Sequence, residues 1–161
     1  MGSFRASRRF AEASLAELEK THRERYSELL RVATAISGSS AAGQDAVHDA
    51  FVGLIRARRV YRHDGRLEAR IWAAVVNAAR RQTRLRPIPG REIDDGQGAL
   101  RAAISRLPER QRLTLFLRYY ADLDYATTAE ALNTAPGTIA ATLYGAHKAV
   151  RQALEEVKAR V

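Results

Sequence analysis

The sequence contains no cysteine, one tryptophan and one methionine, and only 7% of its 161 residues are aromatic. Without cysteine the chain can form no disulfide, no thiolate metal site and no cysteine nucleophile. No apolar run approaches the roughly 20 residues that a membrane-spanning helix needs, and the first residues lack the apolar core of a signal peptide. These absences predict a cytoplasmic protein without membrane insertion.

Positive charge is what the sequence has in excess, because 27 Lys and Arg against 18 Asp and Glu give a net charge of +9. Such an excess suits a polyanionic partner, either nucleic acid or an anionic membrane surface. The cations are unevenly placed. Residues 1–84 hold 16 Lys and Arg against 9 Asp and Glu, while residues 85–161 hold 11 against 9. If charge marks the contact surface, the first half carries most of it.

Apolar residues recur at helical spacing along nearly the whole chain, and no segment has the strict alternation of a β-strand. Three helices are expected before residue 86, with a break at Gly38-Ser39-Ser40. Residues 86–98 contain two Pro and three Gly, which predicts a linker, and four shorter helical segments follow. We therefore expect an all-α chain with two small helical domains, residues 10–86 and 99–158, joined by a short linker at 87–98.

The apolar stripes of these helices are expected to form the cores of the two domains. The stripe of the first helix consists of Leu15, Leu18, His22, Tyr26, Leu29 and Ala33. Near the C-terminus, residues 124–154 predict a short helix, a turn at Asn133-Thr134-Ala135 and a longer helix opened by Pro136. This order is how a helix-turn-helix places a recognition helix in the major groove of DNA, although an ordinary helical hairpin has the same pattern.

The C-terminal segments carry a resemblance to a known family. The matching segments, in the right order and without gaps, are Leu107–Arg112, Leu117–Tyr120, Leu123–Tyr125, Ala129–Leu132 and Pro136–Ile139. They resemble region 4 of bacterial RNA polymerase sigma factors of the sigma-70 family, and are most similar to the small extracytoplasmic-function (group 4) type. Regulators with related C-terminal domains share parts of this pattern, so region 4 alone does not distinguish a sigma factor from such a regulator. The first half of the chain provides the distinction.

Residues 45–51 resemble the region 2 segment that the family writes as Asp-x-x-Gln-Glu-x-Phe, with His48 in place of the usual Gln. In that family this helix docks on the clamp helices of RNA polymerase. The spacing of the three polar residues puts them on one helix face, which without the resemblance would be an ordinary solvated face. The polymerase-binding residues that the resemblance implies are Asp45, His48, Asp49, Phe51 and Leu54.

Residues 61–67 resemble the family's loop that captures an unstacked base of the promoter −10 element, and the helix that follows has the family's Asn and its trailing cations. In this chemistry the cations hold the phosphate backbone while a polar loop reads an extruded base. A solvated basic helix end is the alternative, since the helix dipole favours cations there. The −10 DNA-binding residues implied are Tyr61, Arg62, His63, Asp64, Asn77, Arg80, Arg81 and Arg84.

The sequence departs from the family in the recognition helix. After Gly137-Thr138-Ile139 the family usually has three cations, but this chain has Ala140, Thr142 and Gly145 at those positions. Each lost phosphate contact lowers the salt slope of binding by about one unit, so −35 recognition is expected to be atypical and more apolar. The −35 DNA-binding residues implied are Thr138, Ala140, Ala141, Thr142, Tyr144, His147, Lys148 and Arg151. A further departure is Arg70, which stands where a Trp is usual, with Trp72 two residues later.

Nothing in the sequence indicates an enzyme, a metal site or a cofactor. Gly38 and Gly43 have P-loop spacing, but Gln44 follows where the phosphate-binding Lys would be needed, and the four His lack metal-ligand spacing.

The resemblance implies a transcription initiation factor. It would bind core RNA polymerase through the β′ clamp helices and the β flap, recognise and melt the −10 element with the N-terminal domain, and contact −35 DNA with the C-terminal domain. Promoter DNA and an anti-sigma factor are the further partners implied. The alternative is a sigma-like interaction protein or sigma antagonist that binds polymerase without specifying promoters.

Overall fold

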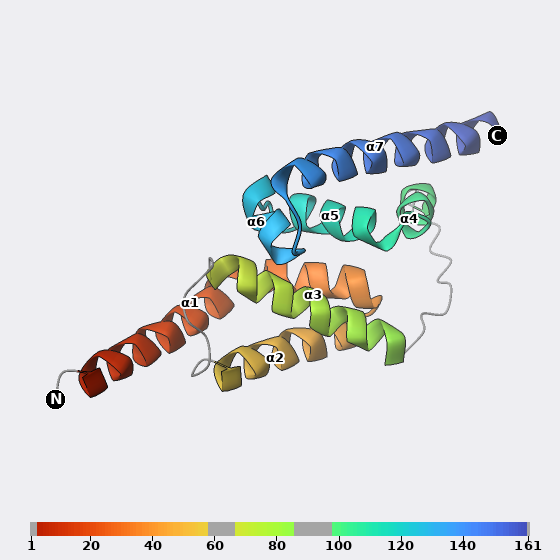
Figure 1. Cartoon of the computed structure of the whole chain (residues 1–161). Helices are drawn as coiled ribbons and strands as arrows, with labels where there is room; N and C mark the ends of the chain where they lie inside the picture. Colours follow the sequence, from red (N-terminus) through yellow and green to blue (C-terminus); the bar gives the residue numbers. More distant parts are fainter. Residues whose placement is uncertain (1–2, 58–66, 86–97, 161) are drawn as a thin grey trace. The chain divides into compact units, whose positions relative to one another are not determined.

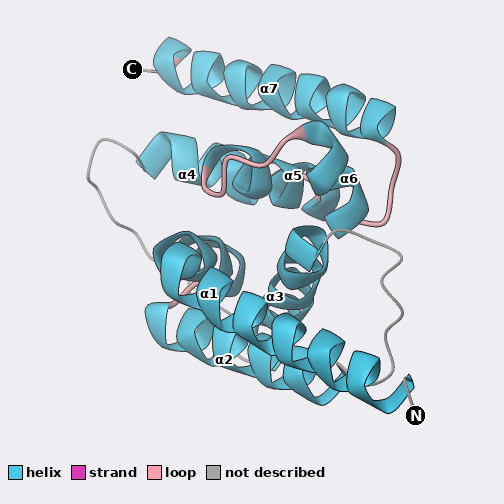
Figure 2. Cartoon of the chain, turned by 90° about the vertical axis from the view of Figure 1, so that its left-hand side faces the viewer, coloured by secondary structure: helices cyan, strands magenta, loops and turns pink. Residues whose placement is uncertain are grey.

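The computed structural model describes residues 3–57, 67–85 and 98–160, with the side chains of 15–57, 67–83 and 98–160. This described part of the chain consists of helices joined by short loops and contains no strand, as Figures 1 and 2 show. The all-α prediction is therefore confirmed. In chain order the helices are α1 (Ser3–Ser37), α2 (Ser40–Ala57), α3 (Leu67–Leu85), α4 (Gly98–Ser105), α5 (Glu109–Tyr119), α6 (Tyr125–Ala131) and α7 (Pro136–Ala159).

The chain divides into two compact units, residues 1–86 and 87–161. In the N-terminal unit each of α1, α2 and α3 packs against the other two. Burial of large apolar side chains removes them from water and is the main force that holds the three helices together. The largest fully buried side chains of this core are Leu29, Val32, Val47, Ile71, Trp72 and Val75. The predicted linker at 87–98 lies outside the described residues except for Gly98.

The junction of α1 and α2 depends on two glycines. Gly38 has a φ of 85° and its N–H donates to the carbonyl of Thr34 at 2.7 Å, which ends α1. Gly43 lies where α2 approaches α1 most closely. A Cβ there would stand 2.4 Å from Oγ1 and 2.9 Å from the backbone nitrogen of Thr34. The predicted break at residues 38–40 is confirmed. At Gly43 the two helices lie so close together that there is no room for a side chain.

The predicted core stripe of α1 is only partly buried. Leu18, Leu29 and Ala33 are buried, but Leu15 is 39% exposed and Tyr26 is 38% exposed. The prediction is therefore wrong for these two residues. A helix presents only one face to its neighbours, and an apolar stripe that is wider than this face leaves its margins in water.

In the C-terminal unit α7 packs against α4, α5 and α6. The core of this unit gathers side chains from α5, α6, α7 and the turn after α4: Leu107, Leu115, Ala129, Ile139, Leu143 and Ala146. The predicted turn is confirmed, since α6 ends at Ala131 and α7 begins at Pro136. Asn133 in this turn has a φ of 51°, a conformation that Asn tolerates better than most residues.

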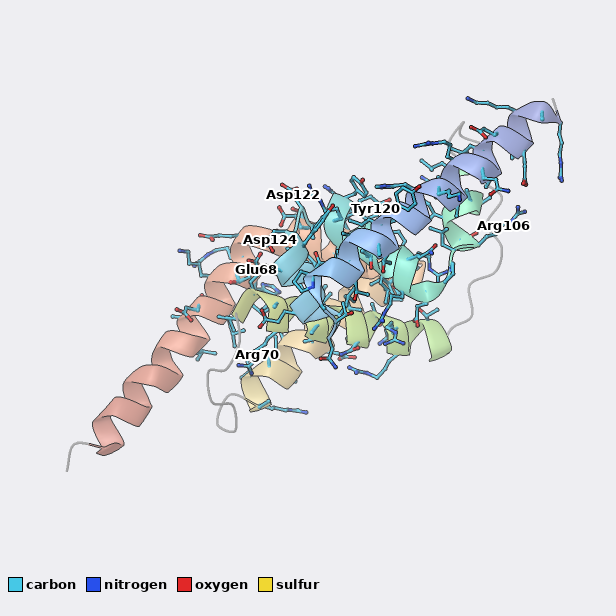
Figure 3. The ribbon with its side chains drawn as sticks, turned by 45° about the horizontal axis from the view of Figure 1, so that its top comes forward. Glu68, Arg70, Arg106, Tyr120, Asp122 and Asp124 are labelled. Atoms are coloured by element: carbon cyan, nitrogen blue, oxygen red, sulfur yellow. The ribbon has the colours of Figure 1, made fainter. Side chains whose placement is uncertain are left out.

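Short polar contacts build the connection between α5 and α6. Arg118 donates to the carboxylate of Asp122 at 2.8 Å, and Asp122 has a φ of 50°. Asp124 caps α6, because its Oδ1 accepts a hydrogen bond of 2.6 Å from the N–H of Thr127. Figure 3 shows both aspartates at this connection. The cap thus fixes where α6, the first helix of the helix-turn-helix, begins.

Candidate functional site

The exposed face of α2 carries three of the residues predicted to bind polymerase. Asp45, His48 and Asp49 are all exposed, while the opposite face of the helix is buried through Ala46, Val47, Ala50 and Phe51. The structure therefore brings the three polar side chains together on one outward surface. Their chemistry suits a partner that offers cations or hydrogen-bond donors.

The two apolar members of the predicted set occupy other places. Phe51 is only 7% exposed and its ring meets the imidazole of His22 edge to face, with ring centroids 4.7 Å apart. Phe51 is thus a core residue that fixes the orientation of α2. Leu54 is half-buried and lines a groove beside the polar face. Only Leu54 of these two is positioned to touch a partner.

A groove of about 330 Å³ runs between α2 and α3. Its polar lining comes from Asp49 on α2 and from Arg70, Asn77 and Arg81 on α3, and its floor consists of small or apolar residues such as Gly53. A Cβ added to Gly53 would meet no atom within 4 Å, so the groove is open at this point. The α2 side of the groove therefore carries a carboxylate, and the α3 side carries two guanidinium groups.

The groove joins residues that the sequence had assigned to two different functions. Asp49 and Leu54 belong to the predicted polymerase-binding set, while Asn77 and Arg81 belong to the predicted −10 set. Arg70 was noted only as a departure from the family pattern. Its spacing from Asn77 and Arg81, seven and eleven residues, was the signal that could have placed it on the same helix face.

Other residues of the −10 set lie outside what the structure describes. Tyr61, Arg62, His63 and Asp64 fall in the undescribed segment 58–66, and the side chain of Arg84 is also outside the described part. Asn77 and Arg81 are exposed on α3, and Arg80 is half-buried. The described part of this set is therefore a polar face of α3.

The beginning of α3 is held by a contact that sequence reasoning missed. Arg25 on α1 forms an ion pair with Glu68 in the first turn of α3 and another, of 2.5 Å, with Glu28. Its guanidinium carbon also lies 5.4 Å from the centroid of the Trp72 ring, within cation–π range. Trp72 is a core residue, 1% exposed. Figure 3 shows Glu68 and Arg70 near the beginning of α3.

The outward face of α7 contains most of the predicted −35 residues. Thr138, Ala140, Ala141, Tyr144, His147, Lys148 and Arg151 are all exposed, opposite the buried Ile139, Leu143 and Ala146. Thr142 is half-buried and its hydroxyl donates to the carbonyl of Thr138 at 2.7 Å. The structure thus brings this set together, with Thr142 at its margin.

The charge of this face changes along α7. From Pro136 to Tyr144 it bears no charged side chain, and Tyr144 itself is 74% exposed. Cations appear only with Lys148 and Arg151. Gly145, at another position where the family has a cation, faces Gln111. A Cβ there would lie 3.2 Å from the Gln111 amide nitrogen.

No group of three or more His, Asp or Glu side chains that could hold a metal ion occurs among the described residues. In the same part of the chain no helix is long and apolar enough to cross a membrane.

The C-terminal unit is similar to a known protein family. Residues 97–150 match the family model described as sigma-70, region 4. No curated protein matches the chain.

Two solved structures are similar over most of the chain. CnrH, solved in complex with the cytosolic domain of CnrY, has a TM-score of 0.75 and 15% identity over 93% of this chain and 95% of its own. The sigma factor RpoE from Bartonella quintana, in complex with the anti-sigma factor NepR, has a TM-score of 0.60 and 18% identity over 85% of this chain and 98% of its own. At these identities the likeness establishes a shared fold of two helical domains.

Proposed function

We propose that this chain, a sigma-70 family protein by its fold and by its region 4 domain, is a transcription initiation factor of the extracytoplasmic-function type. It binds core RNA polymerase in the cytoplasm and directs it to promoters. The observation that carries the proposal is the region 4 match over residues 97–150, preceded by a helical unit whose exposed α2 face is acidic and whose α3 face is basic.

In this proposal residues 10–86 act as region 2 and residues 99–158 as region 4. Asp45, His48, Asp49 and Leu54 on α2 contact the β′ clamp helices, with Phe51 holding that helix in place. The groove supports this assignment, because Asp49 and Leu54 line it together. Region 4 contacts the β flap and duplex DNA upstream.

The −10 side of the proposal rests on α3 and the segment before it. Asn77, Arg80, Arg81 and Arg84 hold the phosphates of the melted strand, and residues 61–64 read an extruded base. The ion pair of Arg25 with Glu68 supports this role, because it anchors α3 directly after the reading segment.

Both similar structures contain a protein partner, which adds a further expectation. RpoE was solved with an anti-sigma factor and CnrH with the cytosolic domain of CnrY. We propose that an anti-sigma factor binds this chain as well, and so controls when it reaches the polymerase.

Polymerase binding is tested by removing two carboxylates. Asp45→Asn with Asp49→Asn is expected to weaken binding to purified core polymerase by at least tenfold, because charge-assisted hydrogen bonds to the partner are lost. The matched control is Glu19→Gln with Glu24→Gln, which removes the same charge from exposed positions of α1. Equal affinities of the two double variants would contradict the assignment of the α2 face.

Promoter recognition is tested by run-off transcription with core polymerase on a library of genomic promoters. Transcripts that share a −10 motif are expected, and Asn77→Ala is expected to reduce their yield. The uncharged first turns of α7 favour the second candidate, a sigma-like antagonist. Tight binding to core polymerase without any initiation would establish this second function and reject the first.

A further inference from the structure

Tyr119, at the end of α5, makes a contact that none of the predicted interfaces includes. Its side chain is 59% exposed, and its hydroxyl oxygen lies 2.7 Å from Nε2 of His147 on α7. The two ring centroids are 5.7 Å apart. Because His147 is also exposed, this hydrogen bond holds in one orientation an imidazole that would otherwise sample several rotamers.

The same hydrogen bond has a consequence for the outer ring nitrogen of His147. A neutral imidazole has one donor and one acceptor, so when Nε2 accepts from the Tyr119 hydroxyl the proton resides on Nδ1. When the ring is protonated, Nδ1 keeps its proton and Nε2 donates to the tyrosine oxygen instead. In both of these states Nδ1 is a donor. In the remaining neutral tautomer Nε2 donates to the tyrosine oxygen and Nδ1 accepts, so an acceptor such as a phosphate selects the first two states. Among the described residues His147 forms no other hydrogen bond.

The position of His147 on α7 indicates the class of acceptor. Helical spacing puts His147, Lys148 and Arg151 on the same outward surface as Tyr144. In a helix-turn-helix the first residues of the recognition helix meet base edges, while cations and donors further along contact the sugar–phosphate backbone. The side-chain nitrogen donors of α7 begin at His147, about three turns after the helix starts at Pro136.

We propose that Tyr119 is a positioning residue that holds His147 as a hydrogen-bond donor to a phosphate of duplex DNA. The phosphate is bound beside the cations Lys148 and Arg151. The proposal rests on the proposed role of the C-terminal unit in binding promoter DNA, and it adds α5 to an interface that sequence alone had confined to α7.

A double-mutant cycle on the full chain tests this coupling, with duplex DNA binding followed by fluorescence anisotropy at several salt concentrations. Tyr119→Phe and His147→Ala are each expected to weaken binding about threefold to tenfold, the range for loss of one hydrogen bond. Tyr119→Phe in the His147→Ala background is expected to have no further effect. His147→Lys should restore affinity in the presence of Tyr119→Phe, because a flexible ammonium needs no orienting hydroxyl.

The controls separate a phosphate contact from other roles. Tyr125→Phe, at another exposed tyrosine of the same unit, is expected to leave binding unchanged. The losses should be equal on a duplex with a −35 element and on a scrambled duplex, since phosphates carry no sequence information. A loss confined to the −35 duplex, or an equal loss from Tyr119→Phe with and without His147, would overturn the proposal.

A second pair of substitutions separates the positioning role of Tyr119 from the proposed DNA binding by α7. Lys148→Ala with Arg151→Ala is expected to reduce the salt slope by about two units if this face binds DNA. If that slope falls while Tyr119→Phe has no effect, only the positioning role is wrong. If the slope is unchanged, the C-terminal unit does not bind DNA through this face and both proposals fail.

Discussion

The two units present their predicted interface residues in opposite ways. In the N-terminal unit the polar residues of α2 and α3 line a common groove, with Asp49 on one wall and Arg70 and Arg81 on the other. In the C-terminal unit the outward face of α7 lies where a recognition helix would, but it has no Lys, Arg, Asp or Glu before Lys148. The fold of the helix-turn-helix thus depends on its buried face, on its turn and on the cap of α6, and not on cations of the exposed face. The exposed face is free to lose its cations without any effect on the fold.

The two units also differ in how they are held together. The N-terminal unit depends on a close approach of two long helices at Gly43. In the C-terminal unit three short helices pack against α7, and Asp124 caps the beginning of α6. Changes at these places should therefore affect the stability of one unit and leave the other intact.

The largest effect is expected for Gly43→Ala. The new Cβ would stand within 3.0 Å of the backbone of Thr34, so α1 and α2 must separate, and such overpacking costs about 1–3 kcal/mol. Urea unfolding should show the loss in the N-terminal unit only. As a control, Gly53→Ala adds a Cβ that meets nothing and should stabilise α2 by up to about 1 kcal/mol. Stabilisation by Gly43→Ala would contradict the close contact.

Restoring charge to α7 should produce the next largest effect. Ala140→Lys with Thr142→Arg is expected to strengthen duplex binding and to steepen its salt slope by up to about two units, because two more phosphates come within reach. The control pair, Ala102→Lys with Ser105→Arg, adds the same charge at exposed positions of α4. If the α7 pair left the slope unchanged, that helix would not face DNA.

Removal of the α6 cap should have a moderate effect. Asp124→Ala leaves the N–H of Thr127 without its acceptor and is expected to destabilise the C-terminal unit by about 1 kcal/mol. Asp124→Asn, which keeps a capping oxygen, should stay close to the original stability. Thermal unfolding of the three proteins measures the difference, and equal losses for both variants would show that the cap itself contributes little.

The smallest effect is expected at the ion pair of Arg118 with Asp122. The Asp122 side chain is 93% exposed and water screens the pair, so Arg118→Gln should cost about 0.5 kcal/mol or less. Arg25→Gln in the N-terminal unit should cost more, because Arg25 is mostly buried and also covers Trp72. A larger loss at Arg118 than at Arg25 in urea unfolding would reverse this ranking.

Local patterns in the sequence were enough to predict the helices and some of their ends. Gly38 ends α1 through a positive φ, and Pro136 begins α7 because its missing N–H is harmless at the first turn. The apolar period of the first helix correctly placed Leu18, Leu29 and Ala33 in the core. It failed at Leu15 and Tyr26, since the width of a buried stripe depends on how much of it the neighbouring helices cover.

The candidate sites were also predictable only where their residues lie within one helix. Helical spacing sufficed to group Asp45, His48 and Asp49 on one surface, because those residues are neighbours within a single helix.

Only tertiary structure joined Arg70 to Asp49 across a groove, Arg25 to Glu68 at the start of α3, and Tyr119 to His147. Each of these pairs joins residues of two different helices. The distance between them depends on how the helices pack, and the spacing of apolar residues within one helix does not determine that packing. Composition and periodicity therefore determined the helical fold and the excess of positive charge. Packing decided which of those charges and hydroxyls work together.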